Sequence, residues 1–109
     1  MNRLGLMHEA ELDDDAKTFY HKVNSYTSKK YGAKGMFRQT DGRFLGPFGA
    51  QMHTPHVGEA WLDMAQNIAQ IPGLTLKNRE IVIVATGVRF NAAFELEAHK
   101  RRALSFGVT

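Results

Sequence analysis

The stretch that decides the fold of this chain is residues 76–106, LKNREIVIVATGVRFNAAFELEAHKRRALSF. The β-branched run Ile81-Val82-Ile83-Val84 has the propensity of a strand. The apolar run nevertheless extends through Ala85 to Val88, which is long for a strand, and nothing else in the chain offers a sheet for it to join. We therefore predict a helix over 76–90. Because this helix is apolar nearly all round, it should be central and buried.

A second helix is predicted over 92–106, with Asn91 as its N-cap and Gly107 at its end. One of its faces repeats at steps of four and three residues and consists of Ala92, Leu96, His99, Ala103 and Phe106. If the two helices form an antiparallel hairpin, Glu80 near the start of the first should approach the later part of the second. The pattern thus predicts that Glu80 and His99 meet in an apolar recess, with Glu95 one turn before His99.

Such a carboxylate–imidazole pair can transfer protons near neutral pH. Ionisable groups are expensive to bury, which favours a functional interpretation. Three structural interpretations remain open beside it. His99 can be a hydrogen-bonded core histidine, Glu95 and His99 can be a surface pair, and Glu80 can be a helix-terminal charge paired locally with Arg79.

The remainder of the chain also predicts helices, over 9–28, 47–53 and 55–70, joined by a loop over 32–47 with a turn at Asp41-Gly42. Thr54 and Pro55 suit the start of the third helix. Its apolar face consists of Val57, Ala60, Trp61, Met64, Ile68 and Ala69, and the loop should bury Phe44, Leu45 and Phe48. We expect a single all-α domain over 1–109. The end at Val108-Thr109, directly after a helix-capping glycine, suggests a C-terminal truncation or packing supplied by a partner chain.

Composition excludes several classes of function. The 109 residues are 43% hydrophobic and 23% charged, with a formal net charge of +3. Basic residues are spread along the chain, and the run Lys100-Arg101-Arg102 is typical of a solvated helix face rather than a nucleic-acid site. The chain has no cysteine, so it can form no disulfide, thiolate metal site or redox dithiol. We find neither a signal peptide nor a membrane span and expect a soluble, cytoplasmic protein with no nucleic-acid or membrane partner.

A second cluster of polar residues is His53-Thr54-Pro55-His56, followed by Glu59. Two histidines and a carboxylate suggest a metal site. The two histidines, however, straddle a helix start, and their spacing matches no standard zinc pattern. We therefore predict polar residues at a helix junction and no metal. The chain also has no glycine-rich phosphate loop and no serine-nucleophile motif.

Several of these segments together resemble the carboxymuconolactone decarboxylase family, which is related to alkylhydroperoxidase D. They are Arg79-Glu80 with the apolar run to Val88, then residues 94–99 (FELEAH), then residues 103–108 (ALSFGV). Members of the family often have an Arg-Glu pair, then Tyr-Glu-Trp-x-x-His, then Ala-x-x-x-Gly. Upstream, residues 46–48 and 53–55 are similar to the segment before this motif in longer members. The resemblance covers residues 40–109.

This resemblance implies an all-α fold built on a helical hairpin, assembled as a homo-oligomer (a dimer, trimer or hexamer). It implies a cofactor-independent lyase that acts on a small carboxylated lactone or keto acid. In the peroxidase branch two cysteines lie seven and four residues before the histidine, where this chain has Ala92 and Glu95. Thiol-based peroxide reduction is therefore excluded at this site.

If the chain is such an enzyme, we expect individual residues to have the following roles. His99 would donate or shuttle a proton, Glu80 would orient and tune it, and Glu95 would be a second acid or a hydrogen-bond anchor. Arg79 or Arg89 would hold the substrate carboxylate, and the apolar wall would comprise Phe94, Leu96 and Val84. Two residues depart from the family pattern, since Phe94 replaces the usual Tyr and Leu96 the usual Trp. These departures favour an alternative function, a non-catalytic oligomeric scaffold or small-ligand binder with the same fold.

Overall fold

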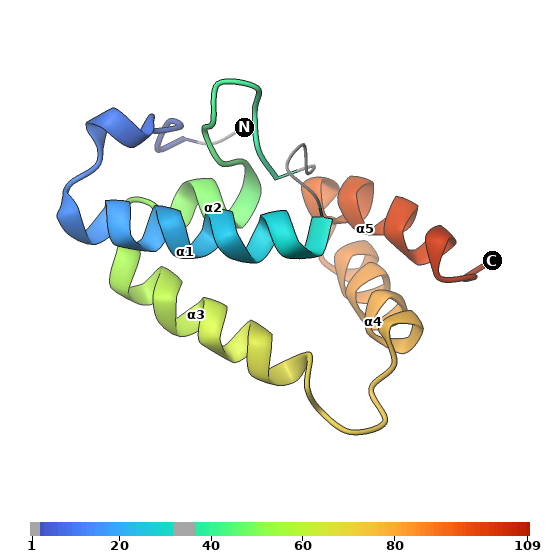
Figure 1. Cartoon of the computed structure of the whole chain (residues 1–109). Coiled ribbons are helices and arrows are strands. Elements are labelled where there is room, and N and C mark those ends of the chain that lie inside the picture. Colours follow the sequence, from blue (N-terminus) through green and yellow to red (C-terminus); the bar gives the residue numbers. More distant parts are fainter. Residues whose placement is uncertain (1–2, 32–36) are drawn as a thin grey trace. The chain divides into compact units, whose positions relative to one another are not determined.

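The structure, a computed structural model, describes residues 3–31 and 37–109. They form a short 3-10 turn and five α-helices (Figure 1): η1 Glu9–Glu11, α1 Asp14–Tyr31, α2 Gly46–Gln51, α3 Pro55–Ile68, α4 Leu76–Arg89 and α5 Ala93–Ser105. Within these ranges the only β-pairing is one bridge between Arg38 and Phe44, so the predicted all-α class is confirmed. No helix in them combines the length and apolar character needed to cross a bilayer.

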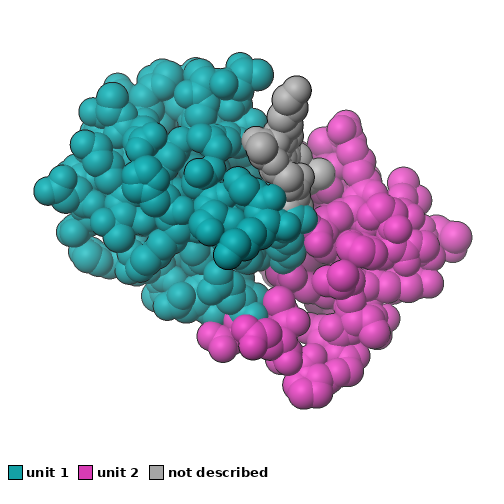
Figure 2. All heavy atoms as spheres, in the orientation of Figure 1, with its two compact units in different colours: residues 1–66 teal, residues 67–109 magenta. Residues whose placement is uncertain are grey.

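The chain divides into two compact units, residues 1–66 and 67–109 (Figure 2). The predicted catalytic and substrate-binding residues all fall in the second unit. The prediction of a single domain over 1–109 stays a prediction.

The first long helix begins later than its apolar periodicity suggests. Residues 9–11 form the separate turn η1, Leu12 is extended, and α1 starts at Asp14. The reason is the side chain of Asp13, whose Oδ1 accepts a hydrogen bond from the backbone N of Ala16 at 2.8 Å. This contact satisfies a backbone donor that has no partner inside the helix, so it fixes the helix start.

The core of the first unit is aromatic. Phe19 from α1 is fully buried, as are Phe44 and Phe48 from the loop and α2, whereas Leu45 is half-buried. The Phe48 ring has its centroid 5.7 Å from that of Trp61 and 6.3 Å from that of Phe44, in edge-to-face arrangements. The predicted turn is present, with Gly42 at φ 91°. Residues 32–36 of the predicted loop lie outside the described residues.

The buried face of α3 differs from the predicted one. Gly58, Leu62 and Ala65 are buried, while Val57 and Met64 from the predicted apolar face are exposed. Phe19 explains the choice, because a Cβ at position 58 would lie 2.5 Å from Cζ of that ring. Only a glycine permits this approach of helix and ring, so packing rather than periodicity selects the face.

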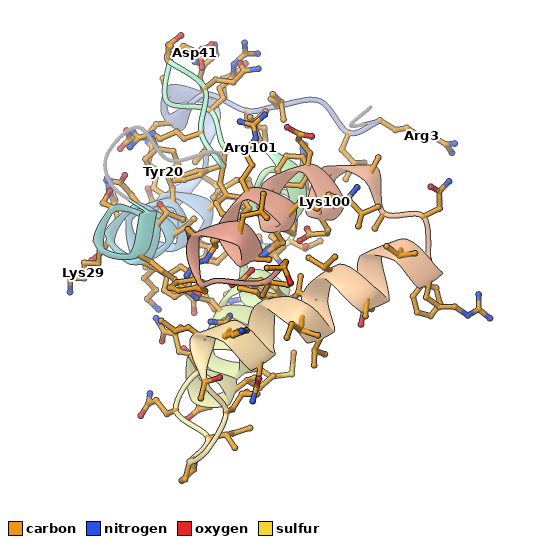
Figure 3. The ribbon with its side chains drawn as sticks, turned by 90° about the vertical axis from the view of Figure 1, so that its right-hand side faces the viewer. Arg3, Tyr20, Lys29, Asp41, Lys100 and Arg101 are labelled. Carbon is orange, nitrogen blue, oxygen red and sulfur yellow. The ribbon has the colours of Figure 1, made fainter. Side chains whose placement is uncertain are left out.

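In the second unit, α4 and α5 form an antiparallel hairpin and lie side by side in Figures 1 and 3. The side chain of Thr75 caps α4 by accepting a hydrogen bond from the backbone N of Asn78 at 3.1 Å. This cap, together with the lack of a neighbouring strand among the described residues, makes the β-branched run helical as predicted.

Asn91 ends α4 rather than capping α5, which corrects the prediction. Its φ is 51°, and the backbone N atoms of Asn91 and Ala92 donate to the carbonyl oxygens of Val88 and Gly87. This pattern is a Schellman motif, in which an asparagine can replace the usual glycine. Gly107, at φ 78°, closes α5 in the same way, as predicted.

The predicted burial of α4 is wrong for this chain. Only Glu80 and Gly87 are buried, whereas Ile81, Val82 and Val88 are exposed. The physical reason is that α5 covers only one side of α4. At that contact Gly87 admits Leu96, whose Cδ2 would lie 3.1 Å from a Cβ at position 87.

Candidate functional site

The hairpin brings together an acid from α4 and the histidine of α5. Glu80 Oε2 lies 2.6 Å from Nδ1 of His99, and the two side chains are 1% and 9% exposed. Because a carboxylate oxygen can only accept, Nδ1 carries the hydrogen and donates a hydrogen bond to Glu80. The expected approach of Glu80 to the later part of α5 is therefore observed, and it leaves Nε2 as the ring nitrogen available for chemistry.

The second ring nitrogen of His99 also faces a carboxylate. Nε2 lies 3.3 Å from Oε2 of Glu95, one helical turn earlier on α5. The Glu95 side chain is 35% exposed, in contrast to the buried Glu80. The imidazole thus lies between a buried carboxylate and a carboxylate that contacts solvent. This arrangement offers a path for a proton between solvent and the buried ring.

A fourth residue of the cluster is Arg102, which was predicted to lie on a solvated helix face. Its Nε lies 3.0 Å from Oε1 of Glu80, and its side chain is only 12% exposed. Lys100 and Arg101, both labelled on α5 in Figure 3, are exposed as predicted, and Arg101 pairs with Glu97 on the surface. The sequence feature that could have identified Arg102 is its spacing from His99, because a residue three positions later lies on the same side of the helix.

The environment of His99 favours its charged form. Burial of the ring lowers the pKa of His99, but the hydrogen bonds to Glu95 and Glu80, together with the charges of these carboxylates, raise it by more. The net effect is a pKa above the ordinary histidine value. The folded environment therefore favours the imidazolium form more than water does, which suits a proton donor.

The two predicted substrate-binding arginines lie in different surroundings. Arg79 directly precedes Glu80 and is half-buried, and its Nη1 has no hydrogen-bond partner among the described residues. Arg89 is exposed at the opposite end of α4, about 13 Å along the helix axis from Glu80. Its guanidinium lies over the ring of Phe90, 5.7 Å from the centroid. The structure therefore does not bring Arg89 to the cluster.

The three residues of the predicted apolar wall do not share one pocket. A pocket of about 460 Å³ on the second unit is lined by Ile81, Val84, Ala85, Lys100, Ala103, Leu104, Val108 and Thr109. Val84 belongs to this pocket, but the other two predicted wall residues do not. Leu96 packs on Gly87, and Phe94 is exposed at the start of α5.

The second cluster, in the first unit, is divided among separate partners. His53 Nε2 lies 3.1 Å from the carbonyl oxygen of Gly5, and His56 Nε2 lies 3.2 Å from Asp15 Oδ2. Glu59 pairs with Lys22 at 2.9 Å. In the described part of the chain, no group of three or more histidine, cysteine or acidic side chains is arranged to hold a metal ion.

Comparison with known proteins gives one match. Residues 55–109, slightly more than half of the chain, match the model of the carboxymuconolactone decarboxylase family. This span contains α3, α4 and α5 and hence all the residues of the site. No curated protein and no solved structure matches the chain. The family predicted from the sequence is confirmed.

Proposed function

Because the chain belongs to the carboxymuconolactone decarboxylase family, we propose that it is a cofactor-independent carboxy-lyase acting on a small carboxylated lactone or β-keto acid. The observation that carries this proposal is the imidazole of His99, held between the buried Glu80 and the half-exposed Glu95. Decarboxylation needs a group that delivers a proton to carbon, and a histidine with a raised pKa is such a group.

In the proposed reaction the bond between the carboxylate and the adjacent carbon breaks. Carbon dioxide leaves, and the electron pair remains on the substrate as an enolate-like anion. His99 then donates its Nε2 proton to that carbon, while Glu80 holds Nδ1–H and stabilises the imidazolium beforehand. Glu95, which is open to water, either returns a proton to Nε2 from solvent or anchors the ring by its hydrogen bond.

Of the two predicted arginines, Arg79 is the better candidate for holding a substrate carboxylate. It adjoins Glu80 in sequence, and its buried Nη1 has no hydrogen-bond partner among the described residues. A buried guanidinium nitrogen of this kind gains most from an incoming carboxylate, because such charged hydrogen bonds are the strong ones. Thiol peroxidase chemistry remains excluded, since the sequence has no cysteine.

A second candidate function is a non-catalytic oligomeric scaffold or small-ligand binder. The exposed apolar residues of the hairpin favour it: Ile81, Val82, Val88 and Leu104. Ile81 and Leu104 also line one pocket, and exposed apolar patches are typical of protein interfaces. Native mass spectrometry tests the assembly, for which we expect a homo-oligomer under either function.

The test of catalysis is carbon dioxide release from a panel of carboxylated lactones and β-keto acids. We expect one of these compounds to turn over and His99→Gln to lower that rate at least about 100-fold, the usual contribution of a general acid. His56→Gln is the matched control, because His56 is an exposed histidine of the first unit. Full turnover by His99→Gln would refute the proposed mechanism. Binding of a panel member by the wild-type protein without turnover would favour the scaffold.

A further inference from the structure

Arg102 is the one member of the cluster that the proposed reaction does not use. Its Nε lies 3.0 Å from Glu80 Oε1, while the other carboxylate oxygen, Oε2, lies 2.6 Å from His99 Nδ1. Glu80 therefore bridges the imidazole of His99 and the guanidinium of Arg102. Arg102 is held in place from its other side as well, because its guanidinium carbon lies over the ring of Phe106, 5.5 Å from the centroid.

The bridge has a consequence for the release of a proton by His99. When the imidazole loses its proton, the buried carboxylate of Glu80 loses a compensating charge. The Glu80 side chain is only 1% exposed, and an unpaired charge in such a buried position costs a large amount of free energy. Without a second cation beside Glu80, His99 would therefore retain its proton. Arginine stays protonated throughout the accessible pH range and compensates Glu80 in both states of the histidine.

We infer that Arg102 is a positioning residue that lowers the proton affinity of the Glu80–His99 pair, so that His99 can both hold and release a proton near neutral pH. In the described part of the chain, the carboxylates of Glu80 from α4 and Glu95 from α5 face the ring, and Arg102 acts through Glu80. The use of this effect in turnover rests on the proposed function. The effect itself is a property of the folded protein and can be measured without a substrate.

The experiment is an NMR titration of the His99 ring nitrogens in the wild-type protein and three variants. Arg102→Gln removes the charge, and we expect it to raise the titration midpoint of His99 by about one pH unit, the usual effect of a neighbouring charge. Arg102→Lys keeps the charge and should restore the wild-type midpoint. Arg101→Gln is the matched control, because Arg101 is the neighbouring arginine, exposed and paired with Glu97, and it should leave the midpoint unchanged.

A folded Arg102→Gln protein with an unchanged or lowered His99 midpoint would overturn the inference, because a merely structural role moves stability and not the titration. A second measurement needs no variant and decides the question if Arg102→Gln does not fold. In the wild-type protein the Arg102 Nε resonance should shift with the same midpoint as His99, and a resonance that is flat through that range would also overturn the inference. Neither result depends on turnover, so failure of the proposed lyase activity is distinguished from failure of this inference.

Discussion

Replacement of Glu80 by glutamine removes a buried charge that contacts two partners and nearly preserves its shape. The carboxylate lies 2.6 Å from His99 Nδ1 and 3.0 Å from Arg102 Nε, and its side chain is 1% exposed. Removing one side of a buried ion pair costs about 3–5 kcal/mol. In this variant Arg102 is still partly solvated, with 12% of its side chain exposed, and His99 still contacts Glu95. We therefore expect a loss at the lower end of this range, about 3 kcal/mol.

The assay is urea denaturation followed by circular dichroism at neutral pH, with the thermal midpoint as a second readout. For a chain near 100 residues, a loss of about 3 kcal/mol lowers the thermal midpoint by at least 10 °C. The matched control is Glu97→Gln, which removes the exposed pair with Arg101 on α5 and should cost about 0.5 kcal/mol or less. If Glu80→Gln proved as mild as this control, the buried network would not stabilise the hairpin and the reasoning would be refuted.

Two further predictions concern stability. Because the pKa of His99 is raised in the folded protein, protonation of this histidine adds to the free energy of unfolding. This contribution is fully present below the unfolded histidine pKa of about 6.5 and is lost as the pH rises through the folded pKa. The stability difference between the wild-type protein and His99→Gln, measured by urea denaturation across pH 5–9, should therefore shrink as pH rises, and a difference that grows with pH would contradict the assignment. Gly58→Ala should destabilise by about 1–3 kcal/mol despite the better helix propensity of alanine, because its Cβ would lie 2.5 Å from Phe19 Cζ; an unchanged denaturation midpoint would show that this ring can move.

Much of the hairpin could be predicted from local signals. Thr75 caps α4, Gly107 closes α5, and the spacing of Leu96, His99 and Ala103 places them on one face. Given an antiparallel hairpin, Glu80 could reach only the later part of α5, and the structure has it beside His99. These predictions depend on helix periodicity and capping alone, which act within a few residues of sequence.

Other features could not be predicted in this way. The cation beside Glu80 was missed because the run Lys100-Arg101-Arg102 was interpreted as one solvated face. Spacing places Arg102 on the same side of α5 as His99, but the pairing with Glu80 also needs the position of α4. The prediction of the buried face of α3 was wrong because Phe19, which is distant in sequence, lies against Gly58.

The sequence by itself determined the helical class, the hairpin, the family and the acid–histidine pair, because each of these follows from spacing and residue chemistry along a short stretch. The tertiary structure alone decided that the buried acid also pairs with Arg102 and which side of α3 enters the core. Both of those outcomes depend on close packing between segments far apart in the chain, where a contact of a few ångströms selects one orientation and excludes the others.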